Sequence, residues 1–97
     1  MESSIETLRD EINRIDESII KLLSARMEVA KKRAALKKNK GIQVEDQARE
    51  SQLFLKIQRE AKENLIDEDF VSEIFGLIVS HSKKGQNKLL EDWKWLS

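Results

Sequence analysis

The fold is decided by residues 5–40, IETLRDEINRIDESIIKLLSARMEVAKKRAALKKNK, which contain neither proline nor glycine. Apolar side chains recur in this stretch in alternating steps of three and four wherever the series is unbroken: Ile5, Leu8, Ile12, Ile15, Ile19, Leu22, Val29 and Leu36. This spacing is typical of an α-helix with one continuous apolar packing seam. The stretch therefore predicts one very long N-terminal helix and an all-α fold.

Two shorter helices are expected after a turn at Gly41. The first is predicted from about Val44 to Asn64, with an apolar side made of Ala48, Leu53, Phe54, Ile57 and Ala61. The second is predicted to begin at Asp67 as its N-cap, with Ile66 and Val71 forming a hydrophobic staple around that cap. No shift in composition marks a linker, so residues 1–97 are expected to form a single domain.

The length of the first helix predicts the assembly. About 35 helical residues extend roughly 50 Å, whereas a compact domain of this size has a radius of gyration of only about 12 to 13 Å. Two shorter helices cannot cover a seam of that length within one chain. The exposed remainder is therefore expected to pack against the same surface of a second copy, as an intertwined helical homodimer.

Composition narrows the class of protein. Hydrophobic residues make up 39% of the chain and charged residues 37%, which is typical of a soluble globular domain. The acidic start and the lack of a long apolar run predict a cytoplasmic protein that does not enter a membrane. With no cysteine and one histidine, the sequence offers neither a thiolate nucleophile nor a histidine-rich metal site. Because 18 basic residues balance 18 acidic ones, attraction to an anion must come from local clustering.

Two positions of the first-helix seam carry arginine instead of an apolar residue. The series 5, 12, 19 continues to Arg26 and Arg33. Arg33, near the helix end, could extend its aliphatic stem along the seam and keep its charge in water. Arg26 lies deeper, and a buried guanidinium is costly unless it is paired, so it suggests an anionic partner, either a protein carboxylate or a ligand.

The later helices carry polar groups at comparable places. Asp46, Arg49 and Glu50 share one helical face that continues into the apolar side, although on spacing alone an ordinary surface ion pair is the simpler interpretation. On the third helix, Ser82 and Gln86 interrupt an apolar stripe. Polar interruptions in two buried faces, one at Arg26 and one here, predict two walls of one pocket.

The basic segment 31–40, KKRAALKKNK, holds six positive charges in ten residues. It could form a nucleic-acid or membrane-surface patch, but it lacks interleaved aromatic residues and the net charge of the chain is zero. Lys37 shares nearly the azimuth of Arg26, about 16 Å farther along the axis. This pair is better suited to opposite ends of a small dianion than to a polymer.

The first helix opens with Leu8-Arg9-Asp10-Glu11-Ile12, followed by Ile15-Asp16. These residues resemble the first-helix signature of the all-helical (AroQ) class of chorismate mutases. The resemblance continues through the chain without insertion or deletion. It places the pocket residues of that family on Arg9, Arg26, Lys37, Asp46, Arg49, Glu50, Ser82 and Gln86.

The resemblance implies an isomerase that converts chorismate to prephenate, in aromatic amino-acid biosynthesis, without a cofactor or metal. Arg26, assisted by Ser82, and Arg9 from the partner chain would bind the two substrate carboxylates. Lys37 and Gln86 would donate hydrogen bonds to the ether oxygen. Glu50 and the backbone near Asp46 would receive the substrate hydroxyl, supported by Arg49. Relatives with a glutamate in place of Gln86 would need it protonated, so this chain is expected to work without an acid-requiring limb between about pH 5 and 8.

Three alternatives remain from the sequence alone. An isochorismate-pyruvate lyase would share the fold and the cationic pocket, but the relatives of that type resemble a version without the carboxylate that Glu50 supplies. A non-catalytic helical dimer module would explain the seam and leave the polar positions as coincidence. A nucleic-acid binder would use residues 31–40 as its contact surface.

Overall fold

The computed structural model describes residues 4–41 and 47–96, with side chains as far as Lys84. Three helices occupy these ranges, with no strand among the residues described: α1 (Ile5–Asn39), α2 (Gln47–Glu63) and α3 (Glu68–Leu96). The predicted all-α class is confirmed, and α1 has 35 residues. The predicted start of the second helix at Val44 lies outside the described residues, and α2 ends one residue before Asn64.

Helix α1 begins and ends at recognisable capping residues. Ser4 adopts an extended backbone, and its hydroxyl accepts a hydrogen bond from the Thr7 N–H at 3.1 Å. At the other end, Gly41 takes a left-handed conformation (φ 70°), and its N–H bonds the Lys38 carbonyl at 3.0 Å. Glycine is well suited to this position because it lacks the Cβ that makes a left-handed backbone costly.

The turn between α2 and α3 is a Schellman motif with leucine in place of glycine. The Ile66 N–H bonds the Ala61 carbonyl at 2.9 Å, and the Leu65 N–H bonds the Lys62 carbonyl at 3.1 Å. Leu65 itself has a φ of 58°. Asp67 then caps α3, because its Oδ1 accepts from the N–H groups of Asp69 and Phe70. The predicted N-cap is confirmed.

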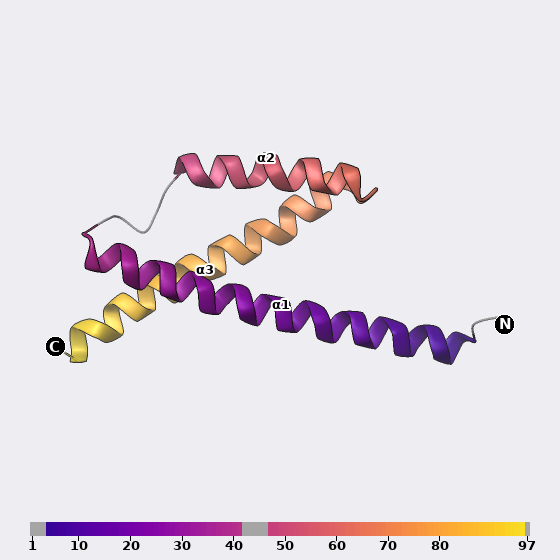
Figure 1. The fold of residues 1–97 in the computed structure, drawn as a ribbon, viewed down its shortest axis with the longest axis horizontal. Helices are drawn as coiled ribbons and strands as arrows, with labels where there is room; N and C mark the ends of the chain where they lie inside the picture. Colours follow the sequence, from indigo (N-terminus) through magenta and orange to yellow (C-terminus); the bar gives the residue numbers. More distant parts are fainter. Residues whose placement is uncertain (1–3, 42–46, 97) are drawn as a thin grey trace.

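Helix α3 organises the chain. It packs along α2 and crosses the C-terminal part of α1 (Figure 1), whereas the backbones of α1 and α2 stay apart over the described residues. Of the described apolar residues, the buried ones are Ala34, Ile57 and Ala61. On the predicted apolar side of α2, Leu53 and Phe54 are half-buried. Ala48, which was also expected there, is exposed because it lies on the first turn of α2.

The N-terminal half of α1 extends away from the other two helices (Figure 1). The radius of gyration is 17.6 Å, and the principal extents are 61 × 30 × 16 Å. The first five seam residues, from Ile5 to Ile19, have between 46% and 74% of their surface exposed. The prediction that the long helix reaches beyond its own domain is confirmed, and the partner chain stays a prediction. Over the ranges that the structure describes, no helix has the length and apolarity needed to cross a membrane.

Candidate active site

A cavity of about 250 Å³ lies where α3 faces both other helices. Each helix contributes part of its wall. Its lining residues are Arg26, Val29, Ala30 and Arg33 from α1, Arg49, Glu50 and Leu53 from α2, and Val79, Ser82 and Lys83 from α3. Apolar side chains therefore form part of a wall whose polar groups are mostly cationic, as expected of a pocket for a small anion.

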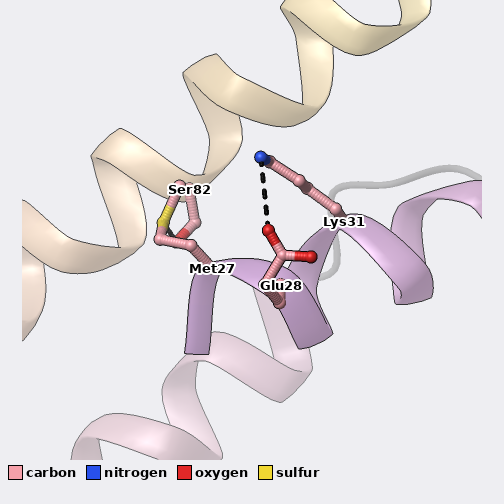
Figure 2. A network of polar contacts seen from close by, with 4 residues as sticks. All are labelled: Met27, Glu28, Lys31 and Ser82. Carbon is pink, nitrogen blue, oxygen red and sulfur yellow. Dashed lines mark hydrogen bonds and ion pairs between the residues drawn. The ribbon is translucent and has the colours of Figure 1, made fainter. Parts of the chain in front are cut away.

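The junction of α1 and α3 is marked by the contact between Arg26 and Ser82. Arg26 Nη1 donates to Ser82 Oγ at 3.2 Å, and the hydroxyl in turn donates to Met27 Sδ at 3.5 Å. Ser82 is 5% exposed, and Figure 2 shows it against Met27 where α3 crosses α1. The structure thus brings together the two polar interruptions that were predicted to form two walls of one pocket.

Arg26 bonds a neutral group at this junction. Among the residues that the structure describes, its polar partner is the Ser82 hydroxyl, and no carboxylate is paired with it. Arginine stays charged at any pH that proteins tolerate, and a half-buried guanidinium without a counter-charge is electrostatically unfavourable. Of the two partners considered for this arginine, a protein carboxylate is not found among the described residues.

The opposite wall carries the one carboxylate among the lining residues. Glu50 Oε1 lies 2.5 Å from Lys83 Nζ, and the two side chains are 28% and 33% exposed. Against this carboxylate stand four cationic lining residues: Arg26, Arg33, Arg49 and Lys83. The cavity therefore has an excess of positive charge that matches a ligand with more than one negative charge.

Two of the remaining predicted site residues lie away from the cavity, and the side chains of the other two are outside the described part. Lys37 is half-buried on α1, 11 residues beyond Arg26, and does not line the cavity. Arg9 is exposed near the other end of α1, about 25 Å from Arg26 along the axis at 1.5 Å per residue. Asp46 lies outside the described residues. Gln86 lies on α3 one turn beyond Ser82, and its side chain is outside the described part.

Two cations of the cavity were not predicted as site residues. Arg33 was given a seam position aligned with Arg26, with its charge in water as one option, and Lys83 was not considered. Lys83 follows Ser82 and is four residues beyond Val79, so helical spacing alone places it beside the same stripe. That spacing was the available signal for Lys83.

Carboxylate and imidazole side chains, which commonly hold metal ions, are sparse among the residues that line this cavity. Within residues 4–41 and 47–84, no group of three or more His, Asp or Glu side chains is placed to hold a metal ion. The nearest carboxylate to the cavity, Glu50, is engaged by a cation. The hydrogen-bond donors that line the cavity are guanidinium, ammonium and hydroxyl groups, which suit an anion.

Comparison with known proteins agrees with this description. The family described as chorismate mutase type II matches residues 8–87 of the chain. A chorismate mutase of Methanocaldococcus jannaschii is 34% identical over 85 residues, which cover 88% of this chain and 86% of that protein. A bifunctional chorismate mutase/prephenate dehydratase of Buchnera aphidicola, subspecies Acyrthosiphon pisum, is 33% identical over 89 residues, covering 92% of this chain but 23% of that protein. The chain therefore belongs to the chorismate mutase type II family.

Proposed function

We propose that this chain is an isomerase that converts chorismate to prephenate, as its family membership indicates. The observation that carries the proposal is the cavity between the helices. Arg26, which is held by a neutral hydroxyl and not by a carboxylate, faces three further cations there. Chorismate is a small molecule with two carboxylates, so its charge complements this lining.

The reaction requires little chemistry from the protein. The ether C–O bond of chorismate breaks while a new C–C bond forms within the same molecule, so no nucleophile, external oxidant or cofactor takes part. The substrate must be held in a folded conformation, and the ether oxygen gains negative charge as its bond breaks. Catalysis then consists of positioning and of electrostatic stabilisation by hydrogen-bond donors.

Specific roles are proposed for the cavity residues. Arg26 and Ser82 would bind one carboxylate, and the planar guanidinium can do so with two parallel hydrogen bonds. Glu50 and the backbone near Asp46 would accept the hydrogen bond of the substrate hydroxyl, supported by Arg49. Lys37 and Gln86 would donate to the ether oxygen, in hydrogen bonds that strengthen as charge develops and so lower the barrier.

The second carboxylate is assigned to Arg9 of the partner subunit. Arg9 cannot reach the cavity of its own chain, since about 25 Å of helix separates it from Arg26. The exposed apolar seam on the same half of α1 supports a homodimer, because a patch of that length is rarely left in water. In a twofold dimer the exchange is reciprocal, so we expect two sites per dimer and none in a monomer.

The alternatives are less well supported. The family match favours a mutase over a non-catalytic dimer module or a nucleic-acid binder. Glu50, the residue that separates the mutase from an isochorismate-pyruvate lyase, lines the cavity. Aromatic amino-acid biosynthesis in the cytoplasm is the proposed setting, and the relatives joined to prephenate dehydratase are consistent with that pathway.

The test is turnover by the purified chain. We expect chorismate to disappear and prephenate to accumulate, and Arg26→Lys to lower kcat/KM by about 100-fold because lysine cannot form the paired hydrogen bonds. Arg14→Lys, an exposed arginine of α1 away from the cavity, is the matched control and should behave as the wild type. Release of pyruvate from isochorismate, with chorismate untouched, would assign the lyase instead.

A further inference from the structure

The ion pair between Glu50 and Lys83 joins two helices at the cavity wall. It runs from α2 to α3, and both residues line the cavity. Each side chain is about one-third exposed or less. The pair therefore differs from the helix-surface pairs of this chain, such as Lys31 with Glu28, whose side chains are more than half exposed (Figure 2).

Lys83 also occupies a particular place on α3. Its neighbour Ser82 bonds Arg26 on α1, so two consecutive residues of α3 reach the two other helices on either side of the cavity. The backbones of α1 and α2 stay apart over the described residues, whereas α3 bonds both Arg26 and Glu50 and so helps to set their relative position. A change at Lys83 acts on that relative position.

The geometry of the carboxylate allows Glu50 to accept a hydrogen bond from the substrate while it is ion-paired with Lys83. A carboxylate has two oxygens and about four acceptor sites. With Oε1 held by Lys83, acceptor capacity remains for a hydroxyl donor in the cavity. A fixed carboxylate loses less conformational freedom when it binds that hydroxyl, and such pre-organisation favours binding.

We propose that Lys83 is a positioning residue, which fixes the Glu50 carboxylate in the orientation that accepts a hydrogen bond from the substrate hydroxyl. Lys83 acts through Glu50 and does not itself contact the substrate. The inference rests on the proposed function, since it assigns a partner to a residue of that site. It adds a determinant for which the sequence alone gave no role.

The test is a double-mutant cycle on kcat and KM for chorismate. Lys83→Met removes the charge and keeps the stem, Glu50→Gln removes the partner's charge, and the third variant combines them. We expect Lys83→Met to lower kcat/KM about tenfold, the effect of one charge-assisted hydrogen bond. The change should fall mainly on KM, because the hydroxyl contact is made in both the ground state and the transition state. The double variant should match Glu50→Gln alone.

Two controls accompany the cycle. Lys84→Met changes the adjacent lysine, which is exposed, and should leave kcat and KM at wild-type values. Lys83→Arg restores a cation at the same position and should recover most of the activity. The unfolding temperature of every variant is recorded, so that a change in fold is separated from a change in the site.

Each outcome has one interpretation. Absence of turnover by the wild-type chain rejects the proposed function. Turnover by the wild type that Lys83→Met leaves unchanged rejects only the role of Lys83. An equal loss from Lys83→Met in the wild-type and Glu50→Gln backgrounds means direct contact with the substrate and overturns the positioning role. Loss of activity with a matching loss of fold, unrescued by Lys83→Arg, overturns it as well.

Discussion

Replacing Ile15 with alanine should weaken the proposed dimer without harming the helix that carries the seam. Ile15 lies in the N-terminal half of α1, which extends away from the other two helices, and is 58% exposed in the single chain. Alanine has the highest helix propensity of any residue, so α1 is not destabilised by the change. Any loss of association then reports the contact between chains.

The magnitude follows from that exposure. Full burial of an isoleucine side chain contributes about 1.5 to 3 kcal/mol, and the 58% still exposed corresponds to about 1 to 1.5 kcal/mol per copy. A twofold interface contains two copies, so the dimer should lose about 2 to 3 kcal/mol. The dissociation constant should therefore rise about 30- to 150-fold.

Sedimentation equilibrium over a dilution series measures this constant directly. Glu17→Ala is the matched control, because Glu17 is exposed on the opposite, charged face of the same helix. Activity per chain should fall on dilution in step with dissociation, since Arg9 of the partner subunit completes each site. A wild-type chain that is monomeric and fully active at every concentration would refute this reasoning, as would an unchanged dissociation constant in the Ile15 variant.

Three further predictions follow from single features. Leu65→Gly should raise the free energy of unfolding by about 1 kcal/mol in a urea titration at fixed protein concentration, because Leu65 is 94% exposed in a left-handed conformation. Leu55→Gly, inside α2, should lower that free energy by a similar amount, and a change in the same direction for both variants would contradict this. The turnover rate should not change between about pH 5 and 8, because the amide of Gln86 donates a hydrogen bond at any pH. The rate of Gln86→Glu should fall as the pH rises through this range. A wild-type rate that declines in the same way would contradict the role of Gln86. Lys37→Ala should lower kcat about 100-fold with the exposed Lys32→Ala as control, and a rate indifferent to Lys37 would reject its place at the ether oxygen.

The fold was largely predictable because its signals are local. The regular three- and four-residue spacing of apolar residues defines α1, and the capping aspartate at Asp67 defines the start of α3. The left-handed Leu65 was not predictable in this way. Glycine or asparagine normally marks that position, and the backbone hydrogen bonds to Ala61 and Lys62 hold a leucine there instead.

The site was predictable only where helical periodicity reports burial. Arg26 and Ser82 interrupt apolar stripes, and the structure brings them together. The partnership of Glu50 with Lys83 depends on how α2 and α3 are rotated about their axes, which is set by packing between helices and not by either sequence alone. Arg9 is a further case, because a single chain contains no information on where the partner's helix will lie.

The reach of α1 past its own domain has a consequence for inheritance. If each site draws Arg26 from one chain and Arg9 from the other, then a chain defective only at Arg9 and a chain defective only at Arg26 can repair one another. Random pairing makes half of the dimers mixed, and each mixed dimer holds one intact site, so about a quarter of all sites would work although neither parent has any. Two damaged alleles in one cell would then support growth that neither supports alone, provided that the two defects affect opposite ends of the helix.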